Sequence, residues 1–218
     1  MDNLTLNSEI IYPEKDEKIK KAIILLHGYG GDGKDISALS LNWKKHLKNT
    51  VILCPDAHEK CKISPSGFQW FDLSIDDKNY IIDESLKSEI VINNYLISVK
   101  NKFNLKNSDI CLSGFSQGCM MIINIGLTSK EKYGCIVGFS GKIIDKESLS
   151  NRIISKTKTH LLHGRDDIVV PVNNLLEAKD FFIRNKIPVI TKIIDNCDHH
   201  ISIEASSSAL SFIKKNLF

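Results

Sequence analysis

The chain has 218 residues, 42% of them hydrophobic and 25% charged, and a formal net charge of +3. This composition is globular and excludes a disordered chain, and the length suits a single domain spanning residues 1–218. The positive charge is small and scattered, which excludes a nucleic-acid footprint, so we expect no nucleic-acid partner.

Short apolar runs recur along the chain. The N-terminal sequence NLTLNSEIIYP predicts an antiparallel edge strand. The later runs are rich in Ile, Val and Leu and do not alternate with polar residues, which is typical of strands buried on both faces. They lie at 22–28, 50–56, 109–115, 134–140, 159–164 and 189–195.

Between these runs, apolar residues at helical spacing predict helices. The stripes are Ile36, Leu39, Trp43 and Leu47; Leu86, Ile90 and Ile97 within 84–103; Leu175, Ala178 and Phe182; and Leu210, Ile213 and Leu217. Alternating strands and helices imply an α/β fold, with a mostly parallel central sheet and helices on both faces. In such sheets the chemistry lies at the carboxyl ends of the strands.

One of these strand ends carries a G-x-S-x-G motif. Ser116 lies in LSGFSQGC, between the predicted strand 109–115 and a helical segment from Gln117. This arrangement is a nucleophile elbow. Glycine at Gly114 and Gly118 avoids clashes in so sharp a turn, and the helix N-terminus favours negative charge at the serine. The alternative, an ordinary turn, is disfavoured by the flanking strand and helix.

A serine hydroxyl needs a base to accept its proton, and on this fold the expected chain order is Ser, Asp or Glu, then His. The acidic candidates in later loops are Asp145, Asp166, Asp167, Asp195 and Asp198, and the histidines are His160, His163, His199 and His200. The order alone leaves open which member of the adjacent pairs at 166–167 and 199–200 takes part.

The glycine-rich sequence LLHGYGGDGKD at 25–35 follows an early predicted strand. Acyl transfer builds an oxyanion, which preorganised backbone N–H groups stabilise. One donor comes from the residue after the nucleophile, Gln117, and the other from a loop of this kind. A phosphate-binding loop is the alternative, but the glycine spacing matches neither of the common phosphate motifs.

Five blocks, LLHGYGGDGKD, GFQWFDL, LSGFSQGC, HGRDDIVVP and DHHISIE, resemble in order the motifs of the phospholipase/carboxylesterase family. This group of small α/β-hydrolases includes acyl-protein thioesterases, and the match covers nearly the whole chain. The resemblance implies an α/β-hydrolase fold without a large cap domain. It aligns Ser116 with the nucleophile, Asp167 with the acid and His199 with the base. It assigns the oxyanion donors to the backbone N–H groups of Tyr29 and Gln117.

The chain departs from the family pattern at two of these positions. Asp198 stands where the family usually has glycine, and Tyr29 where it commonly has leucine or another apolar residue. Trp70 and Phe71 match a block near the family's acyl pocket, so with Ile168 they are expected to bind substrate. For Trp70, a core aromatic is the alternative.

The resemblance implies a serine hydrolase that cleaves carboxylic esters or thioesters through an acyl-enzyme, without metal or organic cofactor. The expected substrates are small-molecule or acylated-protein esters and thioesters, including lysophospholipids, and the chain is expected to be a monomer or homodimer. Alternatives are a peptidase or dienelactone hydrolase-like enzyme on this fold, or a non-catalytic binding module.

The cysteines and the N-terminus bear on the compartment. The six cysteines show no CxxC pair or metal-ligand spacing. The N-terminus lacks a basic start followed by an apolar stretch, so no signal peptide is expected. The apolar runs are far shorter than the roughly 20 residues that span a bilayer, so no stable membrane insertion is expected. We therefore predict a cytoplasmic protein.

Overall fold

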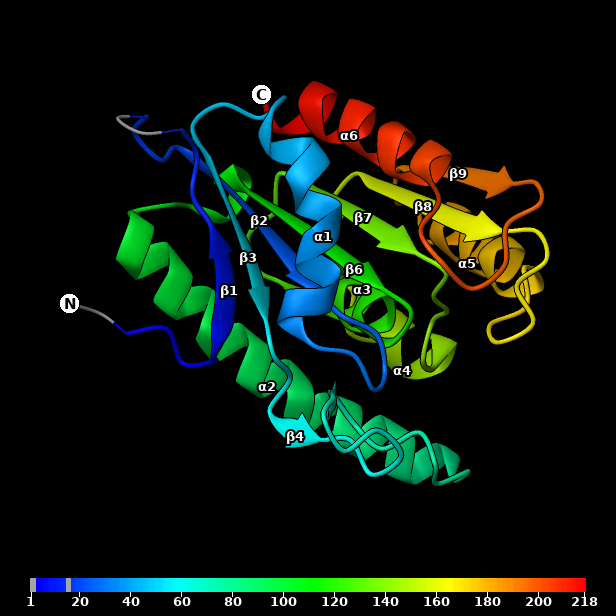
Figure 1. Cartoon of the computed structure of the whole chain (residues 1–218). Coiled ribbons are helices and arrows are strands. Elements are labelled where there is room, and N and C mark those ends of the chain that lie inside the picture. Colours follow the sequence, from blue (N-terminus) through cyan, green and yellow to red (C-terminus); the bar gives the residue numbers. More distant parts are fainter. Residues whose placement is uncertain (1–2, 15–16) are drawn as a thin grey trace.

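The computed structural model describes residues 3–14 and 17–218 (Figure 1). Seven strands form one sheet in the order β1-β3-β2-β6-β7-β8-β9. All neighbours pair in parallel except β1, which runs antiparallel to β3. The strands are β1 (Ser8–Ile11), β2 (Lys21–Leu26), β3 (Thr50–Pro55), β6 (Ile110–Phe115), β7 (Cys135–Phe139), β8 (Thr159–Gly164) and β9 (Val189–Ile194). The predicted parallel sheet with an antiparallel edge strand is confirmed.

Helices cover both faces of this sheet. Helices α1 (Gly33–Lys44) and α6 (Ile203–Leu217) lie on one face, and α2 (Lys78–Phe103), α3 (Gln117–Thr128) and α5 (Asn173–Arg184) on the other (Figure 1). The remaining elements are the hairpin β4 (Glu59–Lys60) and β5 (Phe68–Gln69), the 3-10 helix Asn107–Asp109, and α4 (Lys146–Ser150). Within the described residues, none of these helices combines the length and the apolar character needed to cross a membrane.

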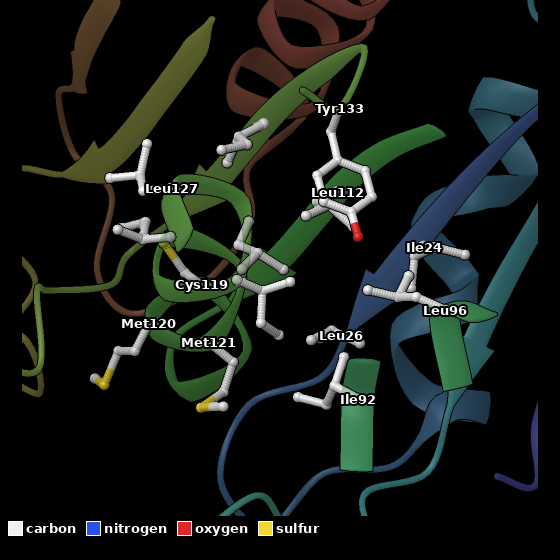
Figure 2. Close-up of a cluster of buried hydrophobic side chains, with 14 of the residues drawn as sticks. Ile24, Leu26, Ile92, Leu96, Leu112, Cys119, Met120, Met121, Leu127 and Tyr133 are labelled. Carbon is white, nitrogen blue, oxygen red and sulfur yellow. The ribbon is translucent and has the colours of Figure 1, made fainter. Parts of the chain in front are cut away.

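Strand β2 shows why the apolar runs do not alternate. Successive side chains of a strand point to opposite faces. Ile24 and Leu26 pack in the core beneath α2 and α3, whereas Ile23 and Leu25 pack in the core beneath α1 and α6. Figure 2 shows the first of these cores, where Leu26 lies near Ile92 of α2 and Ile24 near Leu96 of the same helix. Because both faces are covered, every position of the strand is apolar.

The apolar face predicted for the segment 84–103 is wrong in part. Ile90 and Ile97 are 63% and 51% exposed, and the buried apolar residues of α2 include Ile92, Leu96 and Val99. The helix also begins earlier than predicted, at Lys78. Apolar spacing therefore identified the helix but not the face that it buries.

Polar side chains occupy part of the buried face of α2, which explains the error. The Ser88 hydroxyl donates to the Trp70 carbonyl oxygen. The buried Glu89 accepts from Arg152 at 2.8 and 3.1 Å and from Asn124 Nδ2 at 3.0 Å. A buried polar group is tolerated when it is paired in this way, and these partners lie far away in the sequence.

Candidate active site

Ser116 lies between the end of β6 and the first residue of α3. Its backbone has φ 51° and ψ −115°, outside the regions that L-residues normally occupy. The Ser116 N–H donates to the Phe139 carbonyl oxygen at 2.8 Å, which helps to hold the turn. A strained residue held by its surroundings is typical of a functional site.

The two glycines of the elbow are required by close backbone approach. A Cβ at Gly114 would lie 2.5 Å from the carbonyl atoms of Gly118, and a Cβ at Gly118 would lie 2.3 Å from the Leu26 carbonyl oxygen. Any larger residue would therefore push α3 away from β6 and β2. The glycines allow the sharp turn that presents Ser116.

A chain of hydrogen bonds joins Ser116 to a histidine and a carboxylate. The Ser116 Oγ lies 3.0 Å from His199 Nε2, and His199 Nδ1 lies 2.8 Å from Asp167 Oδ2. The Phe115 ring packs on the His199 imidazole, with centroids 4.8 Å apart. These residues come from the loops after β6, β8 and β9, which end at the same edge of the sheet.

The Asp167 carboxylate is buried, and hydrogen-bond donors contact both of its oxygens. Its Oδ1 accepts the N–H groups of Val169 at 3.0 Å and Val170 at 2.8 Å, while Oδ2 accepts from His199. Burial raises the pKa of Asp167, but the hydrogen bonds from His199 and Val170 outweigh it and hold the pKa below its usual range. Asp167 is therefore ionised at neutral pH.

The structure separates the adjacent candidates that the sequence left open. Asp166 is exposed, and the exposed His200 contacts Asp198 rather than the serine. Three other candidates have partners elsewhere: Asp145 binds Lys78, Asp195 binds Arg165, and His160 binds Ile190 and Ser208. His163 Nε2 donates to the Val170 carbonyl oxygen and lies 3.4 Å from Asp167 Oδ2, so it neighbours the acid and not the serine. In the described part of the chain, Asp167 and His199 are the only ones of these candidates that hydrogen bonds connect to Ser116.

The glycine-rich loop after β2 lies directly against the serine. A Cβ at Gly28 would lie 3.2 Å from Ser116 Cβ. The Gly28 carbonyl oxygen accepts from His27 Nδ1 at 2.7 Å and from the Gly31 N–H at 3.1 Å. Because a peptide group is planar and trans, fixing this carbonyl also fixes the N–H of Tyr29 in the opposite direction.

His27, which the sequence analysis did not select, has a defined tautomer. Its Nε2 accepts the N–H of Ala57 at 3.0 Å, so its proton lies on Nδ1 and is donated to Gly28. Burial lowers the pKa of His27, so the ring is neutral at neutral pH. The signal available in the sequence was the position of His27, directly before the glycine-rich loop.

Three buried histidines predict acid-sensitive stability. Burial lowers the pKa values of His27, His160 and His163. Below pH 6.5 the unfolded chain takes up protons that the folded chain does not, so the free energy of unfolding should fall as the pH falls. Each histidine contributes a slope of up to about 1.4 kcal/mol per pH unit. Urea unfolding at pH 8, 6 and 5 measures this, and His160→Gln should reduce the slope. A constant stability over this range would contradict the prediction.

The segment from Trp70 to Asp72 contacts both residues expected to supply oxyanion donors. The buried Gln117 side chain accepts the Trp70 N–H at 3.0 Å and donates to the Phe71 carbonyl oxygen at 2.6 Å. The Tyr29 hydroxyl donates to Asp72 Oδ1 at 3.1 Å. The sequence analysis expected Gln117 to act through its backbone and assigned no role to Asp72.

Asp72 is an ionised carboxylate in a buried position. Lys62 Nζ lies 2.7 Å from its Oδ2, and the Ser74 N–H and hydroxyl donate to its Oδ1 at 2.8 and 2.6 Å. These contacts, the one to Lys62 first, hold the pKa of Asp72 well below its usual range. The Tyr29 hydroxyl therefore donates to an ionised carboxylate whose position is fixed by Lys62 and Ser74.

The three residues expected to bind substrate occupy different environments. Trp70 is fully buried, and its indole N–H donates to the His27 carbonyl oxygen at 3.0 Å. Phe71 lines a cavity of about 160 Å³, whereas Ile168 is 90% exposed. Across the described residues, no cluster of three or more His, Cys, Asp or Glu side chains is arranged to hold a metal ion.

Comparison with known proteins gives matches over nearly the whole chain. Residues 7–217 match the family description Phospholipase/Carboxylesterase. The chain is 25% identical to acyl-protein thioesterase 1 of Kluyveromyces lactis, covering 93% of this chain and 95% of that one. It is 21% identical to esterase YpfH of Escherichia coli, covering 95% and 88%. The crystal structure of esterase PE8 superposes with a TM-score of 0.92 at 31% identity, covering 97% and 99%. The chain therefore belongs to the phospholipase/carboxylesterase family and is a carboxylic ester hydrolase with the α/β-hydrolase fold.

Proposed function

We propose that the enzyme hydrolyses carboxylic esters and thioesters through Ser116, His199 and Asp167, with an acyl-enzyme intermediate. The observation that carries the proposal is the continuous path from Ser116 Oγ to His199 at 3.0 Å and on to Asp167 at 2.8 Å. The strained elbow that presents the serine supports it further.

In the acylation step, neutral His199 accepts the Ser116 proton at Nε2 while Oγ attacks the carbonyl carbon. Asp167 accepts a hydrogen bond from the Nδ1–H of His199, which fixes the tautomer, and its negative charge stabilises the imidazolium that forms. As the tetrahedral intermediate collapses, Nε2 returns the proton to the leaving oxygen or sulfur. The acyl group then remains on Ser116.

Deacylation repeats these steps with water in place of the serine. His199 Nε2 accepts a proton from the water, whose oxygen attacks the acyl carbon. Collapse of the second intermediate releases the carboxylic acid and returns the proton to Ser116 Oγ. The sum is one ester and one water converted to one acid and one alcohol or thiol.

The backbone N–H groups of Tyr29 and Gln117 would hold the oxyanion in both steps. Within the described chain, neither N–H donates a hydrogen bond to a side chain or to a backbone carbonyl oxygen of a turn, loop or helix cap. Gln117 also begins α3, so its N–H is one of the free donors at a helix N-terminus, where the dipole favours negative charge. Such preorganised donors stabilise charge that develops in the transition state.

The names of the relatives support the substrate class that we propose. Several relatives bear the name acyl-protein thioesterase, and two others are named esterases, YpfH and PE8. We therefore place acylated proteins and small-molecule esters among the substrates of this enzyme.

The six cysteines are all unpaired, which suits a reducing compartment, and we place the enzyme in the cytoplasm.

Separate replacement of the two adjacent histidines tests the proposal. For His199→Ala, turnover of p-nitrophenyl acetate should fall by about 10⁴- to 10⁶-fold, because the base for Ser116 is lost. For His200→Ala it should change by less than about threefold, because that side chain is exposed. An inactive His200→Ala beside an active His199→Ala would overturn the assignment.

A further inference from the structure

A groove of about 720 Å³ lies between α1 and α6. Figure 1 shows these two helices over the same face of the sheet. Apolar side chains that line the groove are Ile36, Leu39, Trp43, Ile201, Ile203 and Leu210. At one end the lining includes His199 and Phe115, so the groove begins at the proposed base.

A second cavity extends the groove toward the proposed oxyanion site. It has a volume of about 250 Å³ and is lined by Gly28 and Tyr29. Asp35, Ile36 and Phe115 line both cavities. An apolar path therefore runs from the glycine-rich loop past Phe115 and His199 to the space between the helices.

The cavity next to Phe71, on the face of the sheet that α2 and α3 cover, is much smaller than the groove. Its volume is about 160 Å³. Besides Phe71, its apolar lining is Leu73, Ile81, Met120 and Ile144, and its charged lining is Asp76, Lys78 and Lys142. Met120 lies in the first turn of α3, and His199 is not part of this lining. The groove and the small cavity therefore differ in volume, and only the groove is lined by the base.

The proton transfer in the reaction determines whether the leaving group or the acyl chain of the substrate faces the groove. The leaving oxygen or sulfur must come within hydrogen-bond reach of His199 Nε2 to receive its proton. Since His199 lines the groove and not the small cavity, the leaving group points toward the groove. The acyl chain extends from the other side of the carbonyl carbon.

We propose that the groove between α1 and α6 binds the apolar part of the leaving alcohol or thiol, and that the small cavity takes a short acyl chain. This inference rests on the proposed function. The charged residues at the rim, Asp35 and Lys45, have opposite signs, so the groove has no concentration of charge for a phosphate group. Among small-molecule esters, the enzyme is thus selective for those that join a long alkyl alcohol or thiol to a short acid.

Isomeric esters test this selectivity directly, because ethyl octanoate and octyl acetate have the same composition. We expect kcat/KM for alkyl acetates to rise from ethyl to octyl by about fourfold for each methylene, which corresponds to about 0.8 kcal/mol, until the groove is filled. For ethyl alkanoates, kcat/KM should stop rising beyond short acids. A rise with acyl length and none with alcohol length would overturn the inference.

Groove-filling variants locate the effect. Ser207 is an exposed residue of α6 in the groove lining, and Ser211 is an exposed residue of the same helix outside it. Ser207→Trp should lower the ratio of octyl acetate to ethyl acetate turnover at least about tenfold, and Ser211→Trp should leave this ratio as in the unchanged chain. Ile144→Phe should instead lower turnover of ethyl butanoate relative to ethyl acetate.

The possible failures are distinguishable. If the enzyme turns over esters but Ser207→Trp and Ser211→Trp give the same ratio, the groove assignment is overturned and the proposed function stands. If the unchanged chain turns over no ester of either series, the proposed function is overturned and this inference with it.

Discussion

Replacement of Ser116 by alanine is expected to lower kcat for esters and thioesters by about 10⁶-fold, leaving only what the oxyanion donors and binding supply. The reason is that no acyl-enzyme can form without Oγ, and His199 then has no proton to accept from the protein. Turnover of p-nitrophenyl acetate and covalent labelling by a fluorophosphonate probe measure the loss. Labelling of Ser116→Ala at the rate of the unchanged chain would contradict the role of this serine.

Replacement of Ser116 by glycine is a control that should match the alanine variant in activity but differ from it in stability. Alanine keeps a Cβ and therefore the strain of the backbone at φ 51° and ψ −115°, whereas glycine tolerates this conformation. Ser116→Gly should be as inactive as Ser116→Ala but more stable to unfolding by about 1–2 kcal/mol. Equal free energies of unfolding would show that the elbow stores no strain.

The architecture was predictable because its signals are local. Residues buried on both faces of a parallel sheet form continuous apolar runs, and β2 is such a run from Ala22 to Leu26. The buried face of α2 was not predictable, because Ser88 and Glu89 are buried through partners that only the fold brings near. Spacing alone therefore favoured Ile90 and Ile97, which are exposed.

Some parts of the candidate site were likewise predictable from local sequence, and others were not. The elbow around Ser116 is encoded in five consecutive residues, so the sequence identified it. The choice between Asp166 and Asp167 depends on the path of the loop, in which the N–H groups of Val169 and Val170 point at Asp167. Residue order cannot show such a contact, and the family resemblance was needed to favour Asp167.

The side chain of Gln117 shows what the sequence analysis missed. Its partners, Trp70 and Phe71, lie 47 and 46 positions earlier in the chain. The same segment continues to Asp72, which binds the Tyr29 hydroxyl. Residues 70–72 therefore hold both residues whose N–H groups are proposed to bind the oxyanion.

Replacement of Gln117 by leucine separates this side-chain role from the backbone N–H, which the variant keeps. Leucine leaves the Trp70 N–H and the Phe71 carbonyl oxygen buried without partners, so the free energy of unfolding should fall by about 2–5 kcal/mol. Without the two hydrogen bonds from the Gln117 side chain to residues 70 and 71, the oxyanion donors can shift. We therefore expect kcat to fall by about 10- to 100-fold with little change in KM. Steady-state kinetics on the folded variant, with urea unfolding in parallel, measure both effects.

Asn124 provides the matched control for a purely structural loss. It is a buried amide on the same helix α3, and its Nδ2 donates to Glu89 at 3.0 Å, away from Ser116. Asn124→Leu should also lower the free energy of unfolding but leave kcat unchanged. The affinity of a trifluoromethyl ketone, which forms an oxyanion on Ser116, should fall with kcat/KM in Gln117→Leu alone. If both variants lose stability while kcat and ketone affinity stay constant in both, residues 70–72 support the fold and do not position the oxyanion donors.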